Sequence, residues 1–416
     1  MKKTFLKAIL GLSLVASTTS VIVSCSNSKD EDETAVIDNS GIDANNFKGN
    51  ITGNVTLDPS KVYTITGKVA VKAGGSLTIP EGTHFKVVEG SIKANGDYEA
   101  TYLIVEQGAK IFINGTASKP VVFEGTEHKQ GHWGGIVVLG NAPSNRSAGG
   151  TSTSELGDLV YGGTNKTDNS GVIKYLVIKD SGYKYSPEKE FNGLSLFGVG
   201  SGTTVSYVYV TNGGDDGVEM FGGNVNLDHI IVTGVGDDSF DWTESWSGTV
   251  DYLYAARMKE FINAVEPGNR GIEADSQDTD PNTTNGANGG ISNPTVRNAT
   301  FIGNSKGAES QGMKIRAGSH GNFDNVVIAN FQTGLDFETD RTYTWFNSGT
   351  KINNVRFVNV GTEWKAKATT ANPNPDLSKA FTKNANATGA GNSTALPDWA
   401  KGWTGLTSFD VADAGN

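Results

Sequence analysis

The chain has 416 residues, a formal net charge of −11 and a pI near 5.0. This length allows one large domain or two small ones, and the negative charge argues against nucleic acid as a partner, because nucleic acid selects Lys and Arg. With 54 glycines and only 36% hydrophobic residues, turns must be frequent, which favours many short strands over a helical bundle. The chain has no phosphate loop and no dinucleotide fingerprint, so we predict no organic cofactor.

Residues 1–24 have the pattern of a lipoprotein signal peptide. Three lysines among the first seven residues precede an apolar run at 8–16 that is too short to span a bilayer. The segment closes on Ile22-Val23-Ser24-Cys25, which resembles a bacterial lipobox. Because Cys25 is the only cysteine, it has no partner for an internal disulfide. We therefore expect Cys25 to carry a lipid anchor, which makes the membrane a partner of the protein.

Residues 25–50 form a polar segment that opens with an acidic run, Asp30 to Glu33. Such a segment cannot bury enough apolar surface to fold, so we predict a lipidated flexible acidic tether. The run also resembles the export signal that follows the lipidated cysteine in surface lipoproteins of the Bacteroidota. That resemblance implies a body anchored in the outer membrane and displayed on the cell surface, whereas the composition alone indicates a solvated linker.

A repeat of 22 residues organises the chain from residue 51 onward. The segment 208–220 aligns with the segment 230–242, and both place an aliphatic strand before a Gly-Asp-Asp turn. A unit of this length with two or three short strands is the size of one coil of a parallel β-helix. Propeller blades need about 40 or more residues, and sandwiches show no register this regular. We therefore predict an all-β fold, with a parallel β-helix, a solenoid, over residues 51–364.

Alternation within the unit predicts which side chains point inward. Two inward files take one residue from each coil: Val218, Phe240, Ile272, Met313 and Leu335, then Met220, Trp242, Ala274, Ile315 and Phe337. Residues 365–416 break the pattern, and we predict a loose connector followed by an aromatic capping segment. In it, Trp399, Trp403 and Phe409 are expected to fold back over the open end of the solenoid, where core and strand edges would otherwise be exposed.

Four features together resemble a known family. They are the β-helix register, the segment 131–140, the Gly-rich turn at 200–204 and the motif Gly214-Asp215-Asp216-Gly217. They are similar to a widespread group of Bacteroidota surface lipoproteins with a right-handed, pectin-lyase-like β-helix, and the resemblance runs from Val62 to Trp403. It implies the right-handed fold, and it implies a function only loosely because the group has no settled activity.

The outward positions of the repeat stack acidic residues about 4.8 Å apart. One outward file is Glu219, Asp241, Glu273, Lys314 and Asp336, and the next outward file holds Asp275, Arg316 and Glu338. Stacked carboxylates repel one another, so either the neighbouring Lys314 and Arg316 or a bound cation must offset the cost. Hard oxygen ligands suit calcium. A solvated acidic face is the alternative interpretation.

Further carboxylates lie in turns and loops beside these files. Asp215-Asp216 and Asp237-Asp238 form a stacked pair whose side chains either bind turn backbone or join a metal site. Asp278, Asp280 and Asn282 have calcium-ligand chemistry without the glycine and distal glutamate of an EF-hand. With calcium as the cofactor, the predicted metal ligands are Asp215, Asp216, Asp237, Asp238, Asp275, Asp278 and Asp280.

Two functions are consistent with this pattern. The favoured hypothesis is a surface lipoprotein that binds glycans, host components or envelope partners along an acidic and aromatic face, in a calcium-dependent way. Its predicted ligand-binding residues are Trp246, Glu219, Asp336 and Glu338, although Trp246 is also compatible with core packing.

The alternative is a polysaccharide lyase or glycoside hydrolase that acts on acidic polysaccharide. Its predicted catalytic residues are Asp241, Glu273, Lys314 and Arg316. Asp237-Asp238, the segment 318–321 and the segment 314–316 echo motifs of enzymes of this fold that hydrolyse polygalacturonate, but with different spacing, an inserted Ser319 and an exchanged Lys and Arg. The acidic pairs repeat too regularly to single out one catalytic pair.

Overall fold

The computed structural model describes residues 36–39, 41–147, 149–154, 156, 159–187, 189–258, 269–277, 290–307 and 309–406. The predicted signal peptide, Cys25 and the first part of the predicted tether lie outside these ranges. Four further residues singled out in the sequence also lie outside them: Asp278, Asp280, Asn282 and Phe409.

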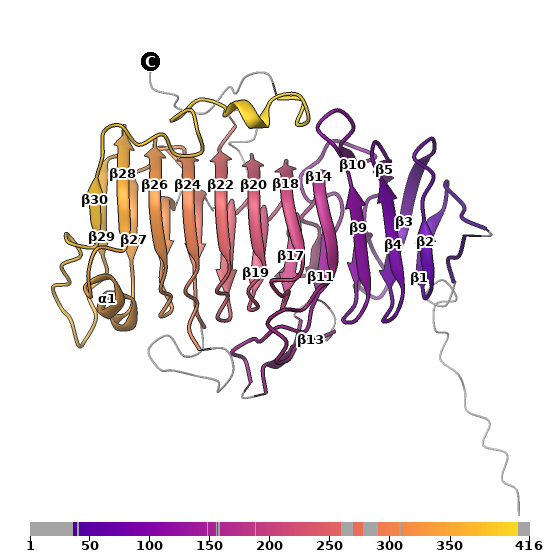
Figure 1. The fold of residues 1–416 in the computed structure, drawn as a ribbon, viewed down its shortest axis with the longest axis horizontal. Coiled ribbons are helices and arrows are strands. Elements are labelled where there is room, and N and C mark those ends of the chain that lie inside the picture. The colour runs from indigo at the N-terminus through magenta and orange to yellow at the C-terminus, as the bar shows by residue number, and fades with distance from the viewer. Residues whose placement is uncertain are drawn as a thin grey trace, which may run out of the picture.

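The chain winds into a parallel β-helix, with its coils stacked from the N-terminal end to the C-terminal end of the molecule (Figure 1). Within the described ranges, parallel pairings join 24 strands in one continuous network, and each coil contributes to three sheets. The predicted all-β solenoid is therefore confirmed. In each of the long strands named below, the first half belongs to the first sheet and the second half belongs to the second sheet.

The long strands that turn from the first sheet into the second are β14 (Gly171–Lys179), β18 (Thr204–Thr211), β20 (Asn226–Thr233), β22 (Thr249–Ala256), β24 (Thr295–Ile302), β26 (Asn322–Ala329) and β28 (Ile352–Val358). The first sheet is completed by β2 (Asn54–Thr56), β4 (Ser76–Pro80), β9 (Lys110–Asn114) and β30 (Phe381–Lys383). The second sheet is completed by β5 (His84–Val87), β10 (Val121–Gly125) and the first half of β3 (Val62–Val71).

The third sheet consists of the second half of β3 with β1 (Phe47–Ile51), β8 (Leu103–Val105), β11 (Ile136–Leu139), β17 (Leu194–Phe197), β19 (Val218–Phe221), β21 (Phe240–Thr243), β23 (Asn269–Ala274), β25 (Ser310–Ile315), β27 (Thr333–Phe337) and β29 (Thr362–Ala366). Three antiparallel hairpins project from the solenoid: β6 (Ser91–Ile92) with β7 (Tyr98–Glu99), β12 (Thr151–Thr153) with β13 (Val160–Gly162), and β15 (Lys184–Ser186) with β16 (Lys189–Glu190).

The predicted register holds along the third sheet. Val218 pairs with Phe240, which pairs with Ile272, and the file continues through Met313 to Leu335. All ten residues of the two predicted inward files are 0% exposed. Since burial of one large apolar side chain contributes about 1.5–3 kcal/mol, these files form the stabilising core of the solenoid.

Each long strand turns the corner between sheets at one residue in the left-handed region. Tyr175, Tyr207, His229 and Tyr252 have φ between 48° and 57°, a conformation that is strained for residues with large side chains. Their rings stack from coil to coil at centroid distances of 4.3, 4.4 and 4.6 Å, which helps to offset that strain. The later corners use asparagine, which tolerates this region well: Asn298, Asn325 and Asn354.

Residues 384–406, which we call the C-terminal strap, run back along the coils from β28 toward β14 (Figure 1). The backbone N–H of Thr388 donates to Asn325 Oδ1 at 2.9 Å, and Tyr254 Oη donates to the carbonyl oxygen of Thr394 at 2.9 Å. The prediction that Trp399 and Trp403 cap the open end is therefore wrong. They lie against the outer face of the second sheet, because that face presents apolar side chains that need cover: Val177, Tyr209, Ile231 and Tyr254.

Both predicted boundaries of the solenoid need correction. At the N-terminal side, β1 begins at Phe47 inside the predicted tether, because Phe47 and Ile51 point into the core and are 2% and 0% exposed. At the C-terminal side, β29 extends to Ala366, and β30 lies within the predicted connector because it pairs with β28. The helix α1 (Asp340–Phe346) precedes β28 and buries Tyr343 and Phe346 in the core. Across the described residues, no helix has the length and apolar character needed to cross a bilayer.

Candidate functional site

The outer face of the third sheet carries a grid of side chains in its C-terminal half, all of them polar except Phe221. Because strands pair in register, each strand from β19 onward places three outward positions beside those of the next strand. From coil to coil, the grid reads Asp216, Glu219 and Phe221; then Asp238, Asp241 and Thr243; then Arg270, Glu273 and Asp275; then Gln311, Lys314 and Arg316; then Thr333, Asp336 and Glu338. The predicted outward files are thus confirmed as neighbours in space.

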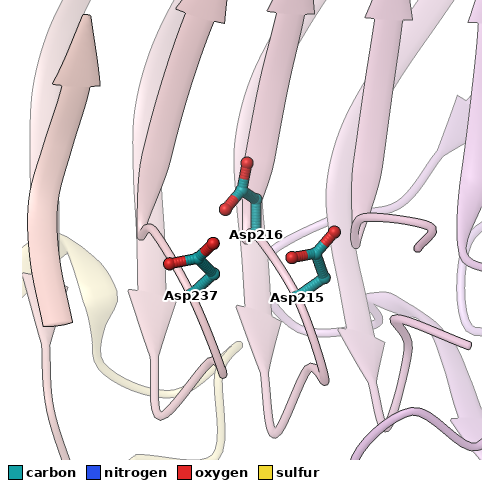
Figure 2. A group of neighbouring side chains, drawn as sticks. All are labelled: Asp215, Asp216 and Asp237. Atoms are coloured by element: carbon teal, nitrogen blue, oxygen red, sulfur yellow. The ribbon is translucent and has the colours of Figure 1, made fainter. Parts of the chain in front are cut away.

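Seven carboxylates from this grid and the adjoining turns form what we call the acidic cluster. Its members are Asp215, Asp216, Glu219, Asp237, Asp238, Asp241 and Glu273. Three sets of three place one oxygen from each residue within 4.8 Å of the other two, and the sets share Asp216 and Asp241. Figure 2 shows one set, in which Asp215 and Asp216 come from the turn before β19 and Asp237 from the turn before β21. Ligand oxygens at such separations can surround one divalent cation.

The cluster disfavours full ionisation of its own carboxylates. Burial raises the pKa of Asp241 well above its ordinary value, and the charges of Glu219 and Glu273 raise it further. Burial likewise raises the pKa of Asp216 and of Asp238, with the charges of their neighbouring carboxylates adding to the effect. The predicted interpretation of a solvated acidic face is therefore wrong, since Asp216, Asp238 and Glu273 are only 6%, 2% and 7% exposed.

Several buried polar atoms of the grid have no hydrogen-bond partner in the described part of the chain. They include Oδ1 of Asp241 and Oε1 of Gln311, together with Oδ1 of Asn192, whose amide nitrogen donates to Glu219 Oε2 at 2.6 Å. Asn192 and Gln311 are 4% and 8% exposed. Buried oxygens normally find a partner because desolvation without one costs about 1–3 kcal/mol. A cation, or the hydroxyl groups of a ligand, would satisfy these oxygens.

Part of the grid is neutralised by Lys314 and Arg316, which is the first of the two alternatives that the sequence left open. Arg316 contacts Glu273 Oε2 at 2.8 Å and Asp275 Oδ1 at 3.0 Å. Lys314 contacts Glu338 Oε1 at 2.5 Å and Asp336 Oδ2 at 3.4 Å. Burial alone would lower the pKa of Lys314, but the hydrogen bonds and charges of Glu338 and Asp336 raise it. Lys314 is therefore held in its protonated form.

Two arginines that were not predicted from the sequence lie at the edge of the acidic cluster. The Arg270 guanidinium lies 3.1 Å from Asp238 Oδ2 and 3.3 Å from Glu273 Oε1. Arg257 is buried and donates to the backbone carbonyls of Val235 and Asp237, which fixes the turn before β21. The register could have found Arg270, because it lies two residues before an inward position, as Asp216 and Asp238 do. Nothing in the repeat indicates Arg257.

A loop from outside the repeat is fixed beside the grid through Glu244. Glu244 is 3% exposed and accepts hydrogen bonds from Ser144 Oγ at 2.7 Å, Arg146 Nε at 2.7 Å and the Tyr161 hydroxyl. Burial raises the pKa of Tyr161, and the charge of Glu244 raises it further, so this hydroxyl keeps its proton. These bonds hold the excursion that contains β12 and β13 against the edge of the third sheet.

Two of the predicted site elements do not reach the acidic cluster. Trp246 is 0% exposed and its indole donates to the carbonyl of Val225 at 3.2 Å, so its predicted role as an exposed ligand-binding aromatic is wrong. The inward-facing rings of Phe240 and Trp242 enclose it. His320, in the segment that echoes the polygalacturonate-hydrolysing enzymes, stacks on Trp345 at 4.3 Å, and burial lowers its pKa to about 4.

The stacked coils define a protein of the parallel β-helix class. The model of the pectate-lyase-like beta helix domain family matches residues 49–404, and the chain belongs to this family. A comparison with curated proteins gives no match.

Two solved tailspike structures resemble the chain. One is the enzymatically active domain of tailspike protein 2 of bacteriophage CBA120, with 14% identity, a TM-score of 0.27 and coverage of 78% of this chain and 42% of that chain. The other is full-length tailspike protein 2 from the Escherichia coli O157:H7 bacteriophage CAB120, with 13% identity, a TM-score of 0.25 and coverage of 78% and 38%. This chain therefore spans about two fifths of each tailspike chain that it matches.

Proposed function

We propose that the protein is a lipid-anchored surface protein of the outer membrane that binds a glycan through a calcium ion held in the acidic cluster. One observation carries this proposal: Asp241, which two of the three carboxylate sets share, has a buried oxygen with no hydrogen-bond partner within the described residues. Membership of the pectate-lyase-like family supports a carbohydrate as the ligand. The anchor would be Cys25, and the acidic residues behind it would form the tether.

The donor set suits calcium better than other biological cations. All seven members of the acidic cluster offer carboxylate oxygens, and the cluster contains no histidine or cysteine. Calcium takes about six to eight oxygen ligands in flexible geometry, whereas magnesium requires a near-ideal octahedron. A cluster that spans neighbouring coils supplies some of these ligands, and the hydroxyl or carboxylate oxygens of a sugar would complete the shell.

The test is calcium titration of the full-length chain by calorimetry, with thermal melting in calcium and in chelator. We expect calcium to raise the melting midpoint and Asp241→Asn to abolish the increase. Glu338→Gln is the matched control, because Glu338 lies on the same face but is paired with Lys314 and Lys367. Glycan binding is then measured on an array of acidic and neutral polysaccharides with and without calcium. Equal melting midpoints in calcium and chelator would contradict the metal site, and calcium-dependent capture of an envelope or host protein alone would contradict the glycan.

Hydrolysis of a glycosidic bond is the second candidate, and one observation favours it. Asp241 is surrounded by carboxylates that raise its pKa, whereas Glu273 lies beside Arg270 and Arg316, whose charges oppose the effect of burial on its pKa. Burial raises the pKa of both groups, but Asp241 has further carboxylates that favour its protonated form, as a general acid requires, whereas the two arginines favour the ionised form of Glu273, as a base or nucleophile requires. A lyase in which Lys314 abstracts the proton is disfavoured, because Lys314 is held protonated.

Product analysis separates the two functions. The full-length chain is incubated with acidic and neutral polysaccharides, and new reducing ends or unsaturated products are measured. Reducing ends that form with the wild-type chain and with Glu338→Gln, but disappear in Glu273→Gln, would establish the hydrolase. Binding without any new chain ends would leave the calcium-dependent binding protein as the function.

A further inference from the structure

A second cleft lies on the same outer face, at the N-terminal end of the third sheet. Its floor is formed by residues of β1 and of the second half of β3, and its volume is about 670 Å³. Its walls come from three excursions of the chain, which contribute Tyr98, Leu156 and Tyr185. A volume of this size lies within the range of about 300–1,000 Å³ that is usual for small-molecule sites. The cleft is therefore a built feature, since segments that are far apart in sequence converge on it.

The cleft is lined by cations although the protein is acidic overall. Four lysines line it, Lys48, Lys68, Lys72 and Lys93, against two glutamates, Glu89 and Glu99. Both glutamates are already engaged, Glu89 by Lys129 and Glu99 by Lys93 at 3.6 Å. Lys72 contacts Glu106 at 2.5 Å. In a chain with net charge −11, this local excess of cations selects an anionic ligand.

Lys68 is the lysine best placed to bind such a ligand. It is partly buried on β3, and no ion pair joins it to a carboxylate within the described ranges. Its strand neighbour Ala70 occupies the outward file that continues, coil by coil, to Glu219 and Asp241. An ammonium group in such a position gains most from a ligand that brings its own negative charge.

The remaining lining residues fit a sugar ring. Tyr98 and Tyr185 are partly exposed, so their rings offer flat apolar faces on which the apolar face of a sugar can pack. Asn50, Thr66 and Ser91 add amide and hydroxyl groups that can bind sugar hydroxyls. A simple inorganic anion would use the lysines and leave the aromatic walls without a role.

We propose that this cleft binds an anionic oligosaccharide, with Lys68 paired to a carboxylate or sulfate group and Tyr98 and Tyr185 against the rings. This site goes beyond the calcium site, because it binds its ligand with protein cations and needs no metal. The two sites lie on one face about five coils apart, which is roughly 24 Å at the spacing of neighbouring strands.

The test is calorimetry of the full-length chain in chelator, which silences the calcium site. The probes are an oligogalacturonate, a sulfated chondroitin fragment, a neutral maltooligosaccharide and inorganic sulfate. We expect binding of one or both anionic oligosaccharides that weakens in high salt. Lys68→Ala should weaken it about tenfold, the effect of losing one charge-assisted bond. The identity of the stronger ligand decides between carboxylate and sulfate.

Controls distinguish the cleft from general charge effects. Lys61→Ala removes an exposed lysine outside the cleft and should leave affinity unchanged. Tyr98→Ala should weaken the binding of the oligosaccharides. Lys68→Gln repeats the test of Lys68→Ala with a variant that keeps a polar side chain. Binding of sulfate alone, equal binding of the neutral sugar, equal effects of Lys61→Ala and Lys68→Ala, or no binding at all would each overturn the proposal. Because chelator is present throughout, failure here does not bear on the acidic cluster.

Discussion

The indole of Trp399 stands edge-on against the ring of His229, with 4.7 Å between the ring centroids and 88° between the planes. This contact joins the C-terminal strap to a corner of the solenoid 170 residues earlier in the sequence. The indole nitrogen of Trp399 also donates a hydrogen bond to the carbonyl oxygen of Ala390 at 2.7 Å, so the strap is folded on itself. The strap is thus a packed part of the structure.

Truncation of this indole should loosen the strap. We expect Trp399→Ala to lower the free energy of strap opening by about 2–3 kcal/mol, since it removes an aromatic contact, a hydrogen bond and apolar burial. Native-state hydrogen exchange of the strap amides measures this change. Lys401→Ala, on an exposed side chain of the same segment, is the control. Equal exchange in both variants would show that Trp399 contributes nothing.

Removal of the charge on Asp241 should change stability in a pH-dependent way when calcium is absent. The folded chain holds protons on its buried carboxylates that the unfolded chain releases above a pKa near 3.8. The free energy of unfolding therefore falls as pH rises through the raised pKa. Asp241→Asn cannot ionise, so in chelator it should melt a few degrees above wild type at about pH 8 and close to it at about pH 4.

Calcium should reverse the sign of this effect. Binding requires ionised carboxylates, so calcium affinity should rise with pH as protons leave the acidic cluster. In saturating calcium, Asp241→Asn should melt below wild type because it has lost a ligand. A variant that is more stable than wild type in both conditions would mean that the cluster is only a site of repulsion. Melting curves with and without chelator at several pH values give both measurements.

The Tyr161 hydroxyl should contribute to the anchoring of the loop beside the grid. Tyr161→Phe removes the bond to buried Glu244 with almost no change in shape, and we expect a loss of about 1.5–3 kcal/mol, the range for bonds to charged groups. Thermal unfolding measures the loss, and limited proteolysis between β12 and β13 should accelerate in parallel. Thr153→Ala, which changes an exposed side chain of the same hairpin, tests whether any change there has this effect.

Replacement of Cys25 should determine where the protein is found. If Cys25 carries the lipid, Cys25→Ala should move the chain from the membrane fraction to the soluble fraction of an expressing cell, while the β-helix keeps its melting midpoint. Protease accessibility of the wild-type chain on intact cells then reports whether the body is on the surface. Continued membrane association of Cys25→Ala would refute the lipid anchor.

The sequence predicted the fold well because the repeat combines two signals. The 22-residue period and the alternation of Val218, Phe240 and Ile272 identify both the coil and its inward face, and neither depends on contacts between distant segments. The same register places Glu219, Asp241 and Glu273 in one file. What it could not predict was the burial of Glu273 and the partial burial of Glu219 and Asp241, which depend on the packing of neighbouring coils and loops.

The errors arose where the repeat ends or is interrupted. Trp246 follows the last residue of β21 by only three positions, and its neighbours in the sequence are polar, which indicated an exposed side chain. The bend after β21 instead turns its ring into the core. Trp399 and Trp403 lie beyond the 22-residue repeat. Their aromatic character therefore indicated that they pack against the solenoid, but it did not indicate on which face. Glu244 and Tyr161 are 83 residues apart, and no local pattern connects them.

The C-terminal strap also has a mechanical consequence. In a solenoid each coil contacts only its neighbours, so the stability is approximately the sum of the stabilities of the coils and of the joints, or interfaces, between neighbouring coils. At the joint between the coils of Glu219 and Asp241, carboxylates of the same charge are stacked. Trp403 packs against Tyr207 on one side of this joint, and Trp399 packs against His229 on the other. The Trp403 indole donates to the carbonyl of Trp399 at 2.9 Å. Trp399 and Trp403 therefore brace these two coils against each other across the joint at which the carboxylates of Glu219 and Asp241 are stacked.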